Sequence, residues 1–149
     1  MKKILLIFIL FTSSCGYQAI YSQQESKELL FSQIILVGDQ EVNRRIVNAL
    51  SIKEDQMSLS SRVLDLNSIF EISETSKNSK GQVNSYRTTL IVKLEIKENE
   101  KILKEKRFFQ DFTYNNTDNK FDLVEYQSEI NNNLINKIIE DIVIYINIK

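Results

Sequence analysis

Apolar and polar residues alternate along the middle of the chain, and the alternation is most regular in residues 86–97. There Leu90 falls on one side and Lys93 on the other. Side chains of a strand point alternately to its two faces, so this pattern predicts a strand with one buried face. Residues 62–74 alternate in the same way, whereas residues 102–114 do so less regularly, which indicates a strand re-phased by a β-bulge.

Two connections join these strands. Residues 73–85 are polar and contain a glycine, and they predict a flexible loop. Asn99 and Glu100 predict a tight turn, because Asn tolerates the backbone conformations that such turns need. Strands that follow one another through short connections pair antiparallel, so residues 62–114 predict an antiparallel meander.

A short strand and a helix precede the meander. Residues 31–37 are apolar and rich in β-branched side chains, which predicts a buried strand. Asp39 suits the N-cap of a helix, and Glu41 lies in the first turn, where the helix dipole favours an acidic side chain. Val42 and Ile46 then recur at helical spacing, which predicts an amphipathic helix of about 13 residues.

The C-terminal part of the chain predicts a long amphipathic helix. Asp122 and Glu125 have the spacing of a capping box, and Phe121 is placed to pack against Tyr126. The apolar stripe of this helix consists of Leu123, Tyr126, Ile130, Leu134, Ile138, Ile142 and Tyr145. Residues 142–149 also alternate, which allows a final strand instead. No turn signal separates them from the helix, so we expect the helix to continue.

These elements follow one another in the order β-α-β-β-β-α. That order predicts an α+β fold, with two helices packed on a four-stranded, mostly antiparallel sheet. If the first strand lies beside the strand that follows its helix, those two strands are parallel. Residues 31–149 are then expected to form a single domain.

The N-terminus has the layout of a bacterial export signal. Residues 1–3 contain two lysines, residues 4–11 are apolar, and small residues lead to Cys15. The apolar run is much shorter than the roughly 20 residues that cross a bilayer. We therefore expect residues 1–14 to be a signal peptide that is removed, and residues 15–30 to be a lipidated tether.

Cys15 is the only cysteine in the chain, and we expect it to carry the lipid anchor. Its sulfur would take a diacylglycerol, and stable anchoring needs more than one acyl chain, palmitate among them. Thr12 stands where a lipoprotein signal usually has Leu. The alternative is therefore an ordinary signal peptide with a cysteine near it by chance.

Composition excludes several kinds of chemistry. The chain has no histidine, which rules out Ser-His-Asp and Cys-His catalysis and weakens any zinc site. A single cysteine forms no internal disulfide, and three glycines do not make a phosphate-binding loop. The net charge of −1 gives no basic field for nucleic acid. We expect no cofactor and no metal.

Acidic residues at strand spacing are the candidates for catalysis: Asp65, Glu71, Glu95, Glu105 and Asp111. A pair of carboxylates can act as general acid and base, but nothing in the sequence orients these residues for that role. A solvated sheet face with salt bridges explains them better. We therefore expect no catalytic residues and no enzyme activity.

Five basic residues fall on the two strands joined by the tight turn: Arg87, Lys93, Lys104, Lys106 and Arg107. A hairpin brings such side chains within cross-strand reach, where they are able to bind phosphates. The alternative is that the charges protect exposed strands from pairing with other chains. A second candidate contact is the stretch of residues 113–116 with Phe121, unless its aromatic rings fold inward.

Three stretches together resemble the LPS-assembly lipoprotein family LptE in its alphaproteobacterial form. Cys15-Gly16-Tyr17 followed by Ile20-Tyr21 is similar to the opening of the mature family members, although Ala19 stands where they have proline. Residues 42–50, VNRRIVNAL, are similar to the family's first helix. Thr113-Tyr114-Asn115-Asn116 is similar to the motif before its last helix.

The resemblance implies a role in the envelope. The protein would sit on the periplasmic side of the outer membrane, held there by its lipid. It would plug and help to assemble an LptD-type β-barrel that moves lipopolysaccharide to the cell surface. The basic residues of the hairpin would then meet lipopolysaccharide phosphates. The alternative is a lipoprotein with another binding or scaffold role in the envelope.

Overall fold

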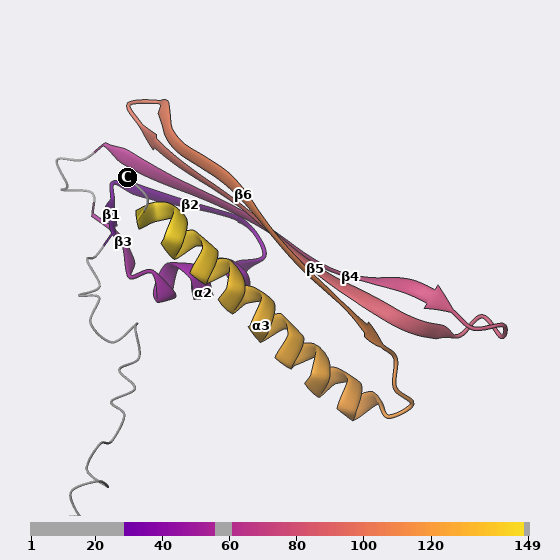
Figure 1. Cartoon of the computed structure of the whole chain (residues 1–149). Coiled ribbons are helices and arrows are strands. Elements are labelled where there is room, and N and C mark those ends of the chain that lie inside the picture. The colour runs from indigo at the N-terminus through magenta and orange to yellow at the C-terminus, as the bar shows by residue number, and fades with distance from the viewer. Residues whose placement is uncertain (1–28, 56–60, 148–149) are drawn as a thin grey trace, which may run out of the picture.

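The computed structural model describes residues 29–55 and 61–147 of the chain (Figure 1). The expected signal peptide, Cys15 and residues 16–28 lie outside the described residues. The described elements are β1 (Leu29–Phe31), β2 (Gln33–Gly38), α2 (Gln40–Ala49), β3 (Ile52–Glu54), β4 (Arg62–Lys77), β5 (Val83–Glu98), β6 (Lys101–Asn115) and α3 (Lys120–Asn147).

The main sheet has four strands in the order β2-β4-β5-β6. β2 is parallel to β4, while β4 and β5, and β5 and β6, are antiparallel. Helix α2 joins β2 to the part of the chain that leads into β4, and such a crossover makes the two strands parallel. Both described helices lie on the same side of this sheet (Figure 1). The predicted α+β fold is confirmed.

Helix α2 begins as the sequence predicts. The Asp39 carboxylate accepts hydrogen bonds from the backbone N–H groups of Glu41 (3.0 Å) and Val42 (2.9 Å), which is an N-cap. The helix has 10 residues and is shorter than expected. It ends where Ser51, with φ 50, turns the chain into β3.

A small second sheet was not predicted. β1 and β3 pair in parallel, with Leu29 opposite Ile52 and Phe31 opposite Glu54. Leu29 and Leu30, which the sequence assigned to the tether, therefore belong to a strand. Three-residue strands are too short to show a period of two, so the sequence carried no signal for them.

Strands β4 and β5 continue through most of the predicted loop, so the expectation of a loop at residues 73–85 was wrong. Only residues 78–82 form the turn, where the Asn78 side chain accepts hydrogen bonds from the N–H groups of Lys80 (2.9 Å) and Gln82 (3.0 Å). The hydroxyl groups of Thr75 and Ser85 lie 2.7 Å apart across the strands. Polar cross-strand pairs thus replace apolar ones, which the hydrophobic pattern does not detect.

The hairpin of β5 and β6 has the predicted turn and bulge. Asn99 and Glu100 both have positive φ, 49 and 66, as a two-residue hairpin turn requires. The register shifts between Ile96, opposite Lys104, and Lys97, opposite Ile102. This irregularity re-phases β6, which explains why its sequence alternates less regularly than that of β5.

Helix α3 starts earlier than the predicted capping box. Asn119 is the cap, because its side chain accepts a hydrogen bond from the N–H of Phe121 (3.1 Å) and its carbonyl one from the N–H of Leu123 (3.1 Å). Phe121 is 87% exposed, so it does not pack against Tyr126 as we expected. The helix runs to Asn147 without a final strand. Neither described helix combines the length and apolarity needed to cross a membrane.

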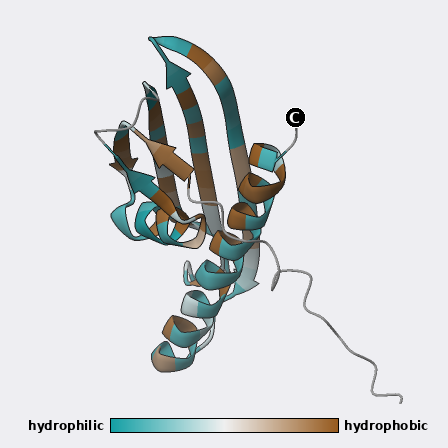
Figure 2. Ribbon diagram, turned by 90° about the vertical axis from the view of Figure 1, so that its left-hand side faces the viewer, coloured by the Kyte–Doolittle hydropathy of each residue, from teal (hydrophilic) through white to brown (hydrophobic). Residues whose placement is uncertain are grey.

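The core lies between the sheet and the two helices. Hydrophobic and hydrophilic bands alternate along the strands in Figure 2. The hydrophobic side chains that point toward the helices include the fully buried Leu64, Leu90 and Leu94. The other face of the sheet carries no described helix. We call the covered side the inner face and the uncovered side the outer face.

Candidate functional site

The five basic residues of the hairpin lie on two different faces of the sheet. Side chains of β5 and β6 alternate between the faces, and the register places Leu94 opposite Lys106 and Lys93 opposite Arg107. Lys104 and Lys106 are therefore on the inner face. Arg87, Lys93 and Arg107 are on the outer face, so the structure does not bring the five together as one patch.

The two inner lysines contact the C-terminal end of α3. Lys104 Nζ donates to the backbone carbonyls of Tyr145 (3.5 Å) and Ile146 (3.0 Å), which a helix C-terminus leaves without helical partners. Lys106 Nζ lies 5.0 Å from the ring centroids of both Phe108 and Tyr145, within range of a cation–π interaction. Both ammonium groups thus help to dock the helix on the sheet.

Tyr145 holds this end of the helix to the edge of the sheet. Its ring meets Phe108 edge-on at 5.9 Å between centroids, and its hydroxyl donates to the backbone carbonyl of Glu105 (3.0 Å). We call Lys104, Lys106, Phe108 and Tyr145 the helix clasp. The sequence pattern predicted that Tyr145 lies on the apolar stripe of the helix. It did not predict that Lys104 and Lys106 lie beside the tyrosine ring.

On the outer face, Lys93 and Lys97 form salt bridges with acidic neighbours. Lys93 bonds to Glu95 and, at 2.9 Å, to Glu105. Lys97 bonds to Glu95 at 2.9 Å and to Asp65 at 3.7 Å. Hydrogen bonds from Lys93 and then Lys97 lower the pKa of Glu95 to about 2. Hydrogen bonds to Glu95 raise the pKa of Lys93 and of Lys97, so Lys93, Glu95 and Lys97 stay ionised across the ordinary pH range.

The remaining outer cations differ in their surroundings. Arg87 pairs with Asp111 at 3.5 Å and donates from Nε to the Thr113 hydroxyl at 3.2 Å. Arg107 forms no salt bridge with another residue of 29–55 or 61–147. The acidic candidates Asp65, Glu95, Glu105 and Asp111 take part in salt bridges on this face. No group of three potential metal ligands occurs among the described residues.

An apolar row crosses the outer face between the charged rows. Ile69 of β4 pairs with Ile91 of β5, which pairs with Phe109 of β6. Ile69 is 53% exposed and Phe109 is 55% exposed. The sequence analysis did not single this row out. In the sequence, each of these residues is an apolar residue on the mostly polar side of its strand. Only the pairing register brings the three side chains together.

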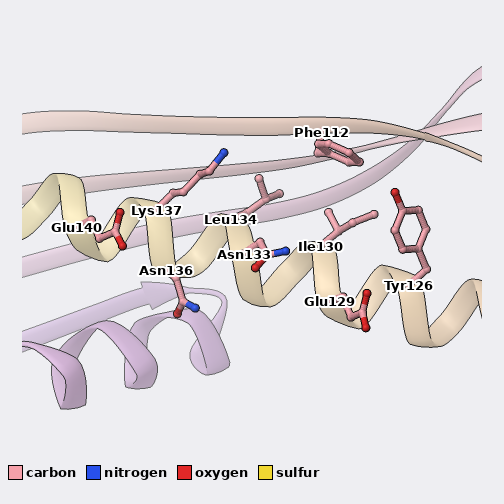
Figure 3. A pocket seen from close by; sticks show the side chains of 9 residues that line it. All are labelled: Phe112, Tyr126, Glu129, Ile130, Asn133, Leu134, Asn136, Lys137 and Glu140. Carbon is pink, nitrogen blue, oxygen red and sulfur yellow. The ribbon is translucent and has the colours of Figure 1, made fainter. Parts of the chain in front are cut away.

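A groove runs along the inner face between α3 and β6. Its volume is about 460 Å³, and Phe112, Tyr126, Ile130 and Leu134 line it. Figure 3 shows Phe112 of β6 facing Ile130 and Leu134 of the helix. Glu129, Lys137 and Glu140 lie among the other lining residues, so the groove has a mixed charge and no basic character.

The aromatic stretch before α3 is largely folded inward. Tyr114 is only 4% exposed, and its ring centroid lies 5.8 Å from those of Tyr86 and Tyr126. Its hydroxyl accepts a hydrogen bond from Gln127 Nε2 (2.9 Å). Phe121 alone points to solvent. Tyr114 therefore joins the end of β6 to α3, and it is not available as a surface contact.

The fold is shared with solved bacterial lipoproteins. The rare lipoprotein B from Shewanella oneidensis matches with a TM-score of 0.58 at 15% identity, over 76% of this chain and 92% of that one. An uncharacterized lipoprotein B from Nitrosomonas europaea matches with a TM-score of 0.55 at 10% identity, over 84% and 88% of the chains. A minor lipoprotein from Acinetobacter baumannii matches with a TM-score of 0.52 at 12% identity, over 76% and 89%.

Sequence comparison adds nothing to this likeness. No protein-family model matches the chain, and no curated protein matches it. Identities of 10–15% show a common fold and nothing finer. The structural neighbours named above are themselves lipoproteins.

Proposed function

We propose that this protein is an outer-membrane lipoprotein that plugs an LptD-type β-barrel and assists its assembly for lipopolysaccharide transport. The observation that carries the proposal is the fold, which spans most of the length of three solved lipoproteins. The lipoprotein pattern at Cys15 and the family resemblance of three sequence stretches point the same way. The protein would face the periplasm, anchored through Cys15 by diacylglycerol and palmitate.

The outer face of the sheet supports a role in protein contact. It combines the apolar row of Ile69, Ile91 and Phe109 with rows of paired charges. Interfaces that form between folded proteins have this mixture of an apolar centre and a polar surround. An assembly role of this kind needs no catalytic residue, and we propose none.

We also propose that the protein binds lipopolysaccharide directly, through basic residues of the hairpin. Arg87, Lys93 and Arg107 share the outer face. Lys93 and Arg107 lie opposite each other, so one phosphate is able to approach both, whereas Arg87 lies about 20 Å further along β5, at about 3.3 Å per residue, and would meet a different phosphate. Lys93 already binds Glu95 and Glu105, so a phosphate there competes with two carboxylates. Lys104 and Lys106 belong to the helix clasp, and we expect them to contribute less.

Co-purification tests the plug. The full-length protein is extracted in detergent through a C-terminal tag, and the bound proteins are identified by mass spectrometry. We expect a large β-barrel protein to co-purify in equal amount. Depletion of the lipoprotein is expected to lower surface lipopolysaccharide. Absence of any barrel protein from the extract, together with normal surface lipopolysaccharide after depletion, contradicts the proposal.

The Cys15→Ser variant tests membrane anchoring separately from binding to the barrel. It removes the only sulfur that is able to take the diacylglycerol, so we expect the protein to leave the membrane fraction. An intact mass of the wild-type protein that shows an unmodified N-terminus contradicts lipidation. A barrel partner that is still captured by the unlipidated variant shows that the plug contact stands without the anchor.

A further inference from the structure

β6 has a free edge in the part of the chain that the structure describes. It pairs only with β5, and it is the last strand of the sheet. The ladder continues to Asn116, whose backbone N–H donates to the carbonyl of Asn84 (2.8 Å). In an antiparallel ladder alternate residues point their backbone groups at the partner strand. From Lys104 to Asn116, beyond the register shift, even-numbered residues therefore point their backbone groups at β5, and odd-numbered residues point theirs away from the sheet.

The hydrogen bond of the helix clasp agrees with this assignment. Tyr145 reaches the carbonyl of Glu105, an odd-numbered residue, from outside the ladder. The same rule turns the N–H and C=O groups of Arg107, Phe109, Asp111 and Thr113 away from β5. No other described residue is seen to bond to these backbone groups. They are the unpaired polar groups that a strand from another chain is able to meet.

The two halves of the edge differ in protection. Residues 101–106 carry Lys101, Lys104 and Lys106, and Tyr145 covers one carbonyl there. Charged side chains of this kind discourage pairing between edge strands. Residues 108–115 contain Asp111 as their only charged residue. The unprotected half begins where the basic run ends.

Apolar surface flanks the unprotected half on both faces. Phe109 is 55% exposed on the outer face and Phe112 is 44% exposed on the inner face. Phe112 also forms one wall of the groove of about 460 Å³ along α3. Side chains of an added strand would alternate between these two surfaces, as in known cases of recognition by strand addition.

We propose that the edge of β6 from Arg107 to Asn115 binds an extended segment of a partner polypeptide as an added antiparallel strand. Charge complementarity defines the segment. An acidic residue is needed opposite Arg107, an apolar one opposite Phe109 and a basic one opposite Asp111. Read from its N-terminus, the segment is basic, then apolar, then acidic at every second position, with apolar side chains between them for the groove.

An extended peptide segment, which carries no packed helix, fits this edge better than a second copy of the chain. Tyr145 brings α3 to the edge of the sheet at Glu105. A second copy paired through its own β6 would bring its own α3 to the same side, where the two helices would meet. This binding goes beyond the proposed function, because it requires neither the lipid anchor nor a barrel.

Residues 106–113 of the chain supply a probe, because KRFFQDFT has the required basic, apolar and acidic order. A fluorescein-labelled peptide of this sequence is titrated with the full-length protein in detergent, and anisotropy is measured. We expect saturable binding in the micromolar range. The control peptide KDFFQRFT, which exchanges Arg and Asp, should bind at least about tenfold more weakly, because both charge pairs become repulsive.

Variants of the protein identify the edge. Asp111→Pro removes an N–H that faces away from the sheet, where proline is tolerated in edge strands. Phe109→Lys places a charge on the same edge. Both should weaken peptide binding at least about tenfold, with an unchanged circular dichroism spectrum. Val37→Lys is the matched control, because Val37 is 47% exposed on the same face of the sheet but lies on β2, opposite Asn67 of β4, and it should bind within about twofold of wild type.

Several outcomes overturn the proposal. It fails if the peptide does not bind saturably, if the control peptide binds equally well, or if Phe109→Lys and Val37→Lys weaken binding to the same extent. It fails also if sedimentation shows that the full chain dimerises and that Phe109→Lys abolishes the dimer, since the occupant is then a second copy. If Asp111→Pro does not fold, Phe109→Lys decides the result.

Discussion

The hydroxyl of Tyr145 donates a hydrogen bond to the backbone carbonyl of Glu105 at 3.0 Å. This bond joins the last turns of α3 to the edge of β6 that points away from β5. Lys104 and Lys106 surround the same tyrosine, which is how two of the five basic residues come to stabilise the fold. The edge of β6 is therefore closed at Glu105, and it is open only from Arg107 onward.

Tyr145→Phe tests this relationship. The ring contact with Phe108 is kept and the hydrogen bond is lost, so the free energy of unfolding should fall by about 1 kcal/mol. Tyr145→Ala removes the ring as well and should cost about 3 kcal/mol. Urea unfolding followed by circular dichroism measures both. Equal stability of Tyr145→Phe and wild type would show that the bond contributes nothing.

Gly38→Ala should be strongly destabilising. Gly38 has φ 85, and a Cβ there would lie 1.8 Å from the Ser68 carbonyl oxygen in the neighbouring strand. β2 and β4 would have to separate, so we expect a loss of more than about 2 kcal/mol. Gly81→Ala is the control, because Gly81 has φ 78 but no atom within 4 Å of the added Cβ. It should cost only about 1–2 kcal/mol, from backbone strain alone.

Asp39→Ala should weaken the start of α2. The carboxylate satisfies the backbone N–H groups of Glu41 and Val42, and loss of an N-cap costs about 1 kcal/mol. Asp39→Asn retains an acceptor oxygen and should recover most of this stability. Thermal unfolding compares the two variants. Asp118→Ala, in the exposed loop before α3, should match wild type.

Glu95 should contribute to stability in a pH-dependent way. Its pKa is lowered from 4.5 to about 2 by hydrogen bonds from Lys93 and Lys97. A depressed folded-state pKa stabilises the fold above the unfolded value, and this contribution is lost as the pH falls from about 4.5 towards 2. Glu95→Gln should therefore be less stable than wild type at pH 7, and the difference should shrink over that window.

The measurement is the free energy of unfolding in urea at several pH values. Other carboxylates titrate in the same range, so the difference between variant and wild type is the informative quantity. Glu71→Gln provides the control, because Glu71 is exposed on the same face and has no salt bridge with another described residue. A constant difference between Glu95→Gln and wild type from pH 7 to pH 2 would refute the assignment.

The sequence determined the main elements of this protein because their signals are local. Alternation in residues 62–74 and 86–97 marked two strands, Asp39 marked the start of α2, and Asn99-Glu100 marked the hairpin turn. Each depends on neighbours a few residues away. The loop at residues 73–85 was predicted wrongly, because the strands there are held by backbone pairing and hydroxyl contacts that leave no apolar pattern.

Only the tertiary structure decided what the charged residues do. Lys93, Lys104 and Lys106 are all lysines of the same hairpin. Strand alternation nevertheless places Lys93 on the outer face and Lys104 and Lys106 on the inner face. The position of α3 then gives the inner lysines a helix end and a tyrosine ring to bind. Which strand is the edge is also decided by strand order. These relationships join residues about 40 positions apart, so no local pattern encodes them.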